Sequence, residues 1–318
     1  MTEPVSAVLR PGWPVDVRLT LSALRMGRAD PCHRLSADGA VWRTGLMATG
    51  PVTYRVVNDG SLHAVRADAW GPGAVEMMDG LADLLGGRDR PETFRAAHPR
   101  LRSAERRLAG LRVPRTGLVF EALVPAVLHQ KIQGRDASHS WGWLVRRHGT
   151  PAPAPAEAAG MTVPPAMMVP PDPGVWAAIP QWDWRRAGVE PFAIRVVRRA
   201  AERAARLDRL ASERPDDPGA VYTVLRSIPG VGPWTAAEVG HRALGDADAL
   251  SVGDYHLAAL TGWALAGRDM GDEEAEAYLE RWRPHRYRVM RLLELTPEAW
   301  PPRRGPRLSR PQHRHGEC

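Results

Sequence analysis

Cysteine and lysine are almost absent from this chain of 318 residues. The two cysteines, Cys32 and Cys318, are far apart in the sequence, which excludes a four-cysteine iron–sulfur cluster and a structural zinc site made of thiolates. Lys131 is the single lysine, so nearly all basic residues are arginines. Arginine stays charged and binds phosphates bidentately. The formal net charge of +7 therefore suits a polyanionic partner.

Long apolar runs are also missing. No apolar stretch approaches 18 residues, and the N-terminal residues lack the pattern of a signal peptide. We therefore expect a soluble, cytoplasmic protein with no membrane partner. The length is sufficient for two or three compact lobes with their own cores.

Residues 1–90 show a mixed pattern that predicts a small α+β lobe. Apolar and polar side chains alternate over residues 17–21, which is typical of a half-buried strand. Turn signals at residues 36–39 and 58–60 predict β-hairpins, and a helix is expected over residues 74–85. The other strands of the expected antiparallel sheet are at residues 41–47, 52–57 and 62–69.

Residues 91–300 show a helical pattern. Apolar side chains between Phe120 and Leu128 recur at the spacing of one helix face. The proline- and alanine-rich residues 151–173 predict an extended or mobile loop, and the basic tail at 301–318 is expected to be disordered. Further helices are expected at residues 136–145, from 176, and at 192–210, 255–265 and 273–295.

Residues 218–244 predict two helices joined by a tight glycine turn. Asp217 caps the first helix, and Pro233 starts the second. Gly230 and Gly232 can adopt positive φ and expose backbone N–H groups, and the positive end of the second helix faces the same turn. Such a turn can bind a phosphate without regard to base sequence. The alternative is an ordinary helical hairpin whose glycines only turn the chain, but the Pro-Gly-Val-Gly-Pro-Trp context favours the phosphate site.

Asp254 follows Gly232 by 22 residues. A carboxylate that returns to the glycine turn could act on a nucleotide held there. The alternative is that Asp254 only caps a helix starting at Tyr255. Both roles are compatible with each other.

These segments resemble a known family. Residues 228–236 together with 252–255 are similar to the helix-hairpin-helix–GPD superfamily of DNA glycosylases, and within it to DNA-3-methyladenine glycosylase II. Residues 126–130 resemble its DNA-wedging segment, and residues 278–286 resemble a late helical motif. The similarity covers about residues 10–300. It implies a mostly α fold in two helical lobes, with an N-terminal α+β lobe that contains an antiparallel sheet.

The resemblance also implies an activity: hydrolysis of the N-glycosidic bond of an alkylated base in double-stranded DNA, by a monomer, in base-excision repair. The damaged base is flipped out of the duplex, and bond cleavage develops positive charge on the deoxyribose. Asp254 is the implied catalytic carboxylate, which stabilises that charge and orients a water. Bifunctional members attack the sugar with a lysine at the position of Trp234. With tryptophan there, we expect a monofunctional enzyme without lyase activity.

Other site residues are carried over from the same resemblance. Trp234 and Tyr255 match aromatic positions of the base pocket, whereas two further aromatic positions appear here as Glu238 and Glu294. The spacing thus predicts a more acidic pocket; the alternative is that these glutamates are solvated surface charges. The DNA wedge corresponds to Gln130 and Lys131. The hairpin that binds the DNA phosphate comprises Gly230, Val231, Gly232, Trp234 and Thr235.

The expected cofactor content is small. No side-chain cluster predicts a metal site, and the resemblance implies at most an alkali ion on the backbone carbonyls of Arg226, Ile228 and Val231. Two other functions stay open at this point. One is a catalytically silent DNA-binding protein, motivated by Glu238 and Glu294. The other is a glycosylase for hypoxanthine, uracil or a mismatched base.

Overall fold

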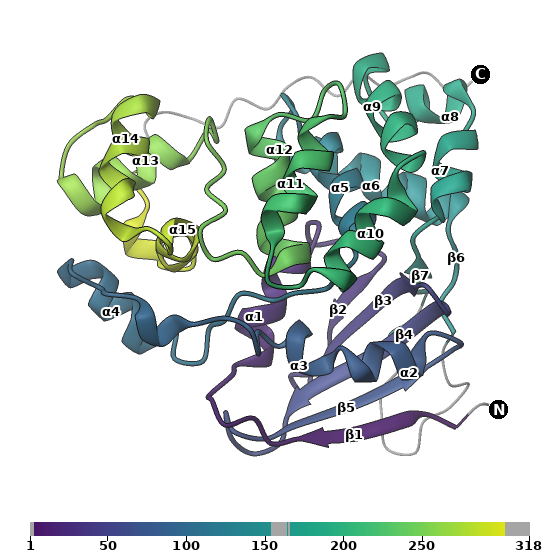
Figure 1. Ribbon diagram of the computed structural model, residues 1–318, viewed down its shortest axis with the longest axis horizontal. Helices are drawn as coiled ribbons and strands as arrows, with labels where there is room; N and C mark the ends of the chain where they lie inside the picture. Colours follow the sequence, from purple (N-terminus) through teal and green to yellow (C-terminus); the bar gives the residue numbers. More distant parts are fainter. Residues whose placement is uncertain (1–2, 154–163, 165, 303–318) are drawn as a thin grey trace.

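The computed structural model describes residues 3–153, 164 and 166–302. Figure 1 shows a sheet lobe below two groups of helices. The central part of the proline-rich loop and nearly all of the predicted disordered tail lie outside the described residues. The described chain contains no helix that is both long and apolar enough to cross a bilayer.

The N-terminal lobe is built on a five-stranded antiparallel sheet in the order β1-β5-β4-β3-β2. Both predicted turns join neighbouring strands, and Gly39 and Gly60 in these turns have φ values of 83° and 74°. The predicted strands β3 to β5 are therefore confirmed, with shifts of a few residues at their ends. The strands are β1 (Val5–Leu9), β2 (His33–Leu35), β3 (Val41–Met47), β4 (Gly50–Asn58) and β5 (Val65–Trp70).

One strand prediction is wrong. Residues Val17–Leu21 form the short helix α1. The Asp16 carboxylate accepts a hydrogen bond from the Leu19 N–H group at 2.8 Å and caps this helix. Apolar residues at positions 17, 19 and 21 fit a strand, but 17 and 21 also share one helix face, and both are fully buried. A segment of five residues fits strand and helix periodicity equally well, and the Asp16 cap favours the helix.

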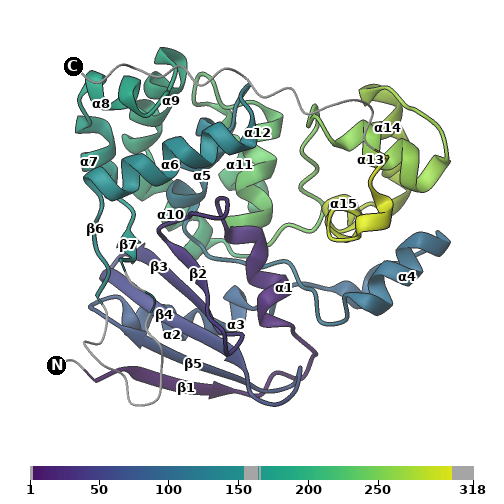
Figure 2. The same cartoon turned by 180° about the vertical axis from the view of Figure 1, so that it is seen from behind.

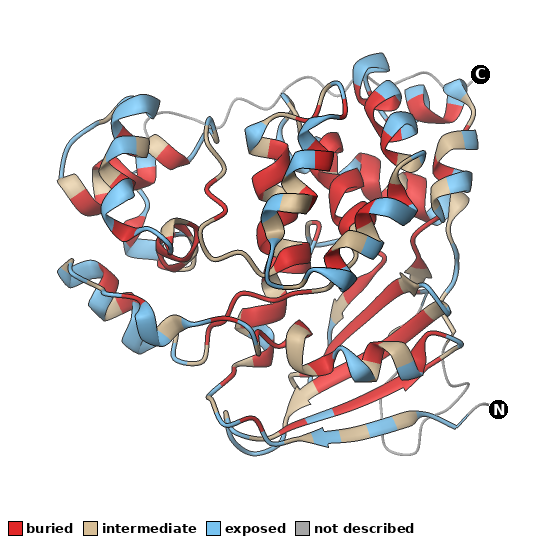
Figure 3. Cartoon of the chain, viewed as in Figure 1, coloured by how far each residue is buried: buried red, intermediate tan, exposed pale blue. Residues whose placement is uncertain are grey.

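The predicted helix at residues 74–85 is present but interrupted. It forms α2 (Ala74–Asp79) and α3 (Leu81–Leu84), which meet at Gly80. These helices and α1 supply side chains to the apolar cluster of the sheet lobe, between Val15 and Leu85. Figure 3 shows buried residues on the central strands and on α1.

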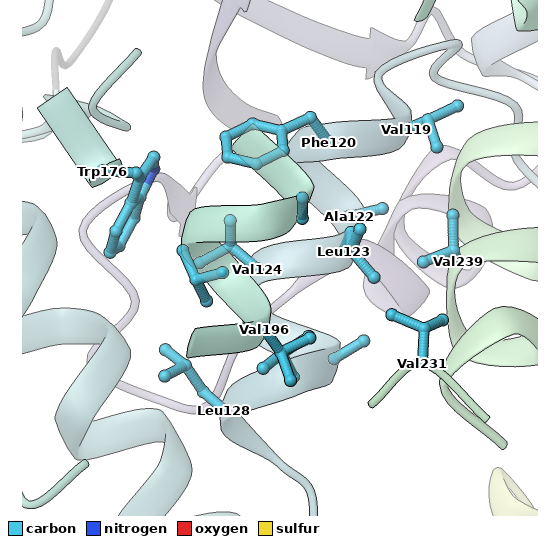
Figure 4. Packing of buried hydrophobic residues seen from close by; sticks show 14 of the residues in the cluster. Val119, Phe120, Ala122, Leu123, Val124, Leu128, Trp176, Val196, Val231 and Val239 are labelled. Atoms are coloured by element: carbon cyan, nitrogen blue, oxygen red, sulfur yellow. The ribbon is translucent and has the colours of Figure 1, made fainter. Parts of the chain in front are cut away.

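The first helical lobe surrounds α5 (Val119–Leu128), whose side chains are buried except for Glu121. The pattern predicted one apolar face, but α5 contacts helices on several sides, so almost its whole circumference is apolar. Figure 4 shows Leu123 and Val124 of α5 among Val196, Val231 and Val239. The other helices are α6 (Gly134–His148), α7 (Pro173–Ala178), α8 (Gln181–Arg186), α9 (Pro191–Ala201), α10 (Ala204–Glu213), α11 (Pro218–Arg226) and α12 (Pro233–Val239).

The second helical lobe combines segments that are distant in the sequence. Its apolar cluster joins residues 94–111 to residues 250–299. The helix predicted at 273–295 is split, because Pro284 follows the 3-10 turn Glu280–Trp282. The helices are α4 (Pro99–Arg107), α13 (Leu257–Thr261), α14 (Asp272–Leu279) and α15 (Arg286–Glu294). The mostly α fold in two helical lobes with an α+β lobe is thus confirmed.

The two ends of the proline-rich loop lie side by side. Thr150–Pro151 (β6) and Met168–Val169 (β7) form a short antiparallel pair. The ladder packs against the sheet lobe, since the Thr44 hydroxyl donates to the Met168 carbonyl at 2.6 Å.

Candidate active site

The predicted helical hairpin is present at α11 and α12. The Asp217 carboxylate accepts a hydrogen bond from the Ala220 N–H group and caps α11. Gly230 has a φ of 101°, and a Cβ atom there would approach Val196 Cγ2 to 2.4 Å, so both conformation and packing require glycine. Gly232 was expected to share the positive φ, but its φ is −91°, because it precedes the first turn of α12 in extended conformation. A Cβ atom at Gly232 would meet no described atom within 4 Å, so this side of the turn is open.

The predicted wedge segment contacts the hairpin directly. Gln130 Nε2 donates to the Gly230 carbonyl at 2.9 Å and to the Thr235 hydroxyl at 2.7 Å. Lys131 has a φ of 59° and is exposed, and its ammonium lies 6.0 Å from the centre of the Phe192 ring. The structure therefore brings the two elements together. The contact of Gln130 and Lys131 with DNA stays a prediction.

Asp254 and Trp234 also meet. The Trp234 indole N–H group donates to Asp254 Oδ2 at 3.2 Å, and the His256 N–H group donates to Asp254 Oδ1 at 2.8 Å. The Asp254 N–H group donates to the Ser251 carbonyl at 3.0 Å. Each carboxylate oxygen thus has one donor that fixes its direction. Asp254 was alternatively expected to cap a helix starting at Tyr255. The helix α13 starts instead at Leu257, and Asp254 stabilises the turn before it.

A cavity of about 170 Å³ lies beside Asp254, between α12 and α15. Glu238 of α12 and Glu294 of α15 both line it, and their place in a base pocket stays a prediction. Tyr255 does not line the cavity: its side chain is 89% exposed and contacts His256 edge-on. Trp234 does not line the cavity either; its indole contacts Asp254 through the hydrogen bond described above, and its place in a base pocket stays a prediction. The lining residues are Ala23, Glu238, His241, Arg242, Ala249, Leu250, Ser251, Asp254, His256, Leu257, Tyr287, Met290, Arg291 and Glu294.

Several polar residues of this cavity were missed at the level of sequence. His241 and Arg242 follow Glu238 by three and four positions, and Tyr287 and Arg291 precede Glu294 by seven and three. Residues at these spacings share one face of a helix. Once Glu238 and Glu294 are placed in the pocket, helical periodicity therefore points to the others.

Glu238 is the centre of a buried polar network. Its carboxylate accepts hydrogen bonds from Arg242 Nη1 at 2.7 Å and from the Ser251 hydroxyl at 2.6 Å. Burial opposes ionisation, but the Arg242 charge and these hydrogen bonds hold the pKa of Glu238 well below its usual range. His241 Nε2 lies 3.3 Å from the same carboxylate. Burial and the Arg242 charge lower the pKa of His241 to about 4, so this imidazole is neutral at pH 7.

Glu294 has a different electrostatic environment. Its side chain is 39% exposed and lies 3.2 Å from Arg291 Nη1. Partial removal from water raises the pKa of Glu294 although Arg291 opposes the shift, and the negative charges of Glu238 and Asp254 add to the rise. The cavity thus carries three carboxylates against two guanidiniums.

The described residues contain no group of three or more His, Cys, Asp or Glu side chains that could hold a metal ion. The Ile228 carbonyl accepts the Val231 N–H group at 2.9 Å and so closes the hairpin turn. A carbonyl oxygen has a second lone pair, so this arrangement is compatible with the alkali ion, which stays a prediction.

Comparison with known proteins gives matches in sequence and in fold. No family model matches the chain. The chain is 29% identical over 291 residues to a probable bifunctional transcriptional activator/DNA repair enzyme AlkA of Mycobacterium tuberculosis, in two strains. The match covers 81% of this chain and 55% of that protein, so the chain spans about half the length of the curated relatives it matches.

Two solved structures show the same fold. A 3-methyladenine DNA glycosylase from Archaeoglobus fulgidus has a TM-score of 0.71 at 16% identity and covers 90% of this chain and 96% of its own. An 8-oxoguanine glycosylase/lyase from Clostridium acetobutylicum has a TM-score of 0.66 at 12% identity, covering 92% of this chain and 96% of its own. The chain therefore has the fold of these two DNA glycosylases, in agreement with the resemblance seen in its sequence.

Proposed function

We propose that the chain is a monofunctional DNA glycosylase that hydrolyses the N-glycosidic bond of an alkylated base in double-stranded DNA. One observation carries this proposal. The Asp254 carboxylate is oriented by the Trp234 indole and the His256 N–H group at a cavity next to the glycine hairpin. The relative described as the DNA repair enzyme AlkA supports a role in DNA repair.

The chemistry follows from this arrangement. A flipped nucleotide enters the cavity while the hairpin binds a neighbouring phosphate. As the glycosidic bond breaks, positive charge develops on the deoxyribose, and the fixed negative charge of Asp254 stabilises it. The same carboxylate can orient or deprotonate the attacking water. Both carboxylate hydrogen bonds are already formed, so little reorganisation is needed during the reaction.

The cavity also favours a particular kind of leaving base. A base alkylated at a ring nitrogen is cationic and can leave without a general acid. The ionised Glu238 and the nearby Glu294 add negative charge around this base.

Base release can be tested by incubating the protein with methylated DNA and measuring free 3-methyladenine and 7-methylguanine. Duplexes with hypoxanthine or uracil, scored as alkali-labile abasic sites, test the alternative lesions. Binding to these duplexes without release of any base would leave only a DNA-binding function.

We expect no lyase step. Trp234 occupies the lysine position of the lyases, and the single lysine, Lys131, lies in the wedge segment beside Phe192. Borohydride added during reaction with abasic DNA should therefore trap no covalent adduct, whereas a lysine-dependent lyase treated in parallel should be trapped. An adduct that disappears in Lys131→Arg would contradict the prediction and assign a lyase step to that residue.

A further inference from the structure

A second concave surface lies outside the proposed active site. It has a volume of about 840 Å³ and runs between α6 and the loop that precedes β2. We call it the α6 groove. Figure 2 shows α6 crossing the lobe that contains α5 and α12. The groove is lined by Gly27, Arg28, Ala29, Gly134, Arg135, Ser138, His139, Trp143, Arg146 and Arg147.

The α6 groove is basic. Four arginines line it, and no acidic residue is among its described lining residues. Arg28, Arg135 and Arg147 are exposed and form no ion pair with the described part of the chain, although many arginines elsewhere pair with carboxylates. Arg146 donates to the Ala29 carbonyl at 2.6 Å, which holds the loop against α6. Guanidiniums gathered without carboxylates attract a polyanion.

The groove residues of α6 form one continuous stripe. Arg135, His139, Trp143 and Arg147 follow each other at intervals of four, so they share one helix face. Between Arg135 and Arg147 the helix rises by about 18 Å. That length corresponds to about five base pairs of B-form duplex.

The stripe begins beside the proposed DNA site. Gln130 is hydrogen-bonded to the glycine hairpin, and α6 starts at Gly134 immediately after the wedge segment. We propose that the α6 groove binds the phosphate backbone of the duplex that flanks the lesion. This inference rests on the proposed function for the presence of DNA, but it concerns affinity for the flanking duplex and not the chemical step.

The double variant Arg28→Gln/Arg147→Gln tests the groove. Arg206→Gln/Arg209→Gln on α10 is the matched control, because it removes the same charge from exposed positions that do not line the groove. Affinity is measured for a duplex of about 25 base pairs, with a central non-cleavable abasic analogue, over a range of KCl concentrations. The slope of log affinity against log salt is negative, and each lost phosphate contact makes it shallower by about 0.9. We therefore expect a slope that is shallower by about 1.8 in the groove variant and unchanged in the control.

Two further measurements separate the possible outcomes. On a duplex of about 9 base pairs, which ends before the far end of the stripe, the single variant Arg147→Gln should bind like the wild type. Base release at saturating enzyme should be unchanged. Equal slopes for wild type and groove variant on the long duplex would overturn the inference, and so would an equal loss in the control variant. Failure of the wild type to bind the abasic duplex would instead overturn the proposed function itself.

Discussion

Asp254→Asn is expected to slow base release by about 10²–10³-fold, the loss typical of removing one preorganised electrostatic group from an active site. Asparagine keeps the size of the side chain and one oxygen that can accept from Trp234 or His256. It removes the negative charge that stabilises the sugar cation. DNA affinity and folding should therefore change little, and the effect should fall on the chemical step.

Single-turnover release of 7-methylguanine at saturating enzyme measures this step directly. Asp272→Asn is a suitable control, since Asp272 is exposed in the first turn of α14 and is removed from the cavity lining. The control should react at the wild-type rate. If Asp254→Asn also reacted at that rate while bound to DNA, Asp254 would have no part in the mechanism.

The sequence predicted the parts of the site that are determined by residues close together in the chain. The hairpin follows from turn residues and caps, and the return of Asp254 to it was implied by the family resemblance. Glu238 and Glu294 were placed by spacing alone, and both line the cavity. Tyr255 illustrates the limit of this reasoning. It is adjacent to Asp254, but the tight turn that directs the Asp254 carboxylate inward leaves the Tyr255 side chain in solvent.

Contacts between distant segments could not be predicted in this way. Asp248, in the segment between α12 and α13, forms ion pairs with Arg283 at 2.9 Å, just before α15, and with Arg286 at 2.7 Å, the first residue of α15. Asp89 forms a buried ion pair with Arg288 of α15. These pairs position the wall of the cavity that carries Glu294. Each pair joins residues at least 35 positions apart in the sequence, and local sequence patterns do not predict such contacts.

Glu238→Ala is expected to lower the free energy of unfolding by about 2–3 kcal/mol, somewhat less than the 3–5 kcal/mol typical of breaking a fully buried pair. The Arg242 and Glu238 side chains are 18% and 16% exposed. Water therefore still reaches the Arg242 charge that is left without its partner, which reduces the loss. The substitution also removes the acceptor of the Ser251 hydroxyl, and the Ser251 carbonyl accepts the Asp254 N–H group. Base release should therefore slow as well, because the loop that presents Asp254 loses an anchor. Urea unfolding and single-turnover release measure the two effects.

Glu238→Gln separates the anchoring role of this side chain from its charge. The amide oxygen can still accept from Ser251 or Arg242, so we expect a smaller loss of stability than in Glu238→Ala and an Asp254 loop that stays in place. The negative charge, however, is gone. At an effective dielectric constant of about 20, a carboxylate and a cationic base about 10 Å apart attract each other by about 1–2 kcal/mol. The preference for cationic 7-methylguanine over neutral hypoxanthine should therefore fall by about tenfold in the glutamine variant. An unchanged preference would show that Glu238 acts only by holding Arg242 and Ser251, and would leave Glu294 and Asp254 as the carboxylates that attract the base.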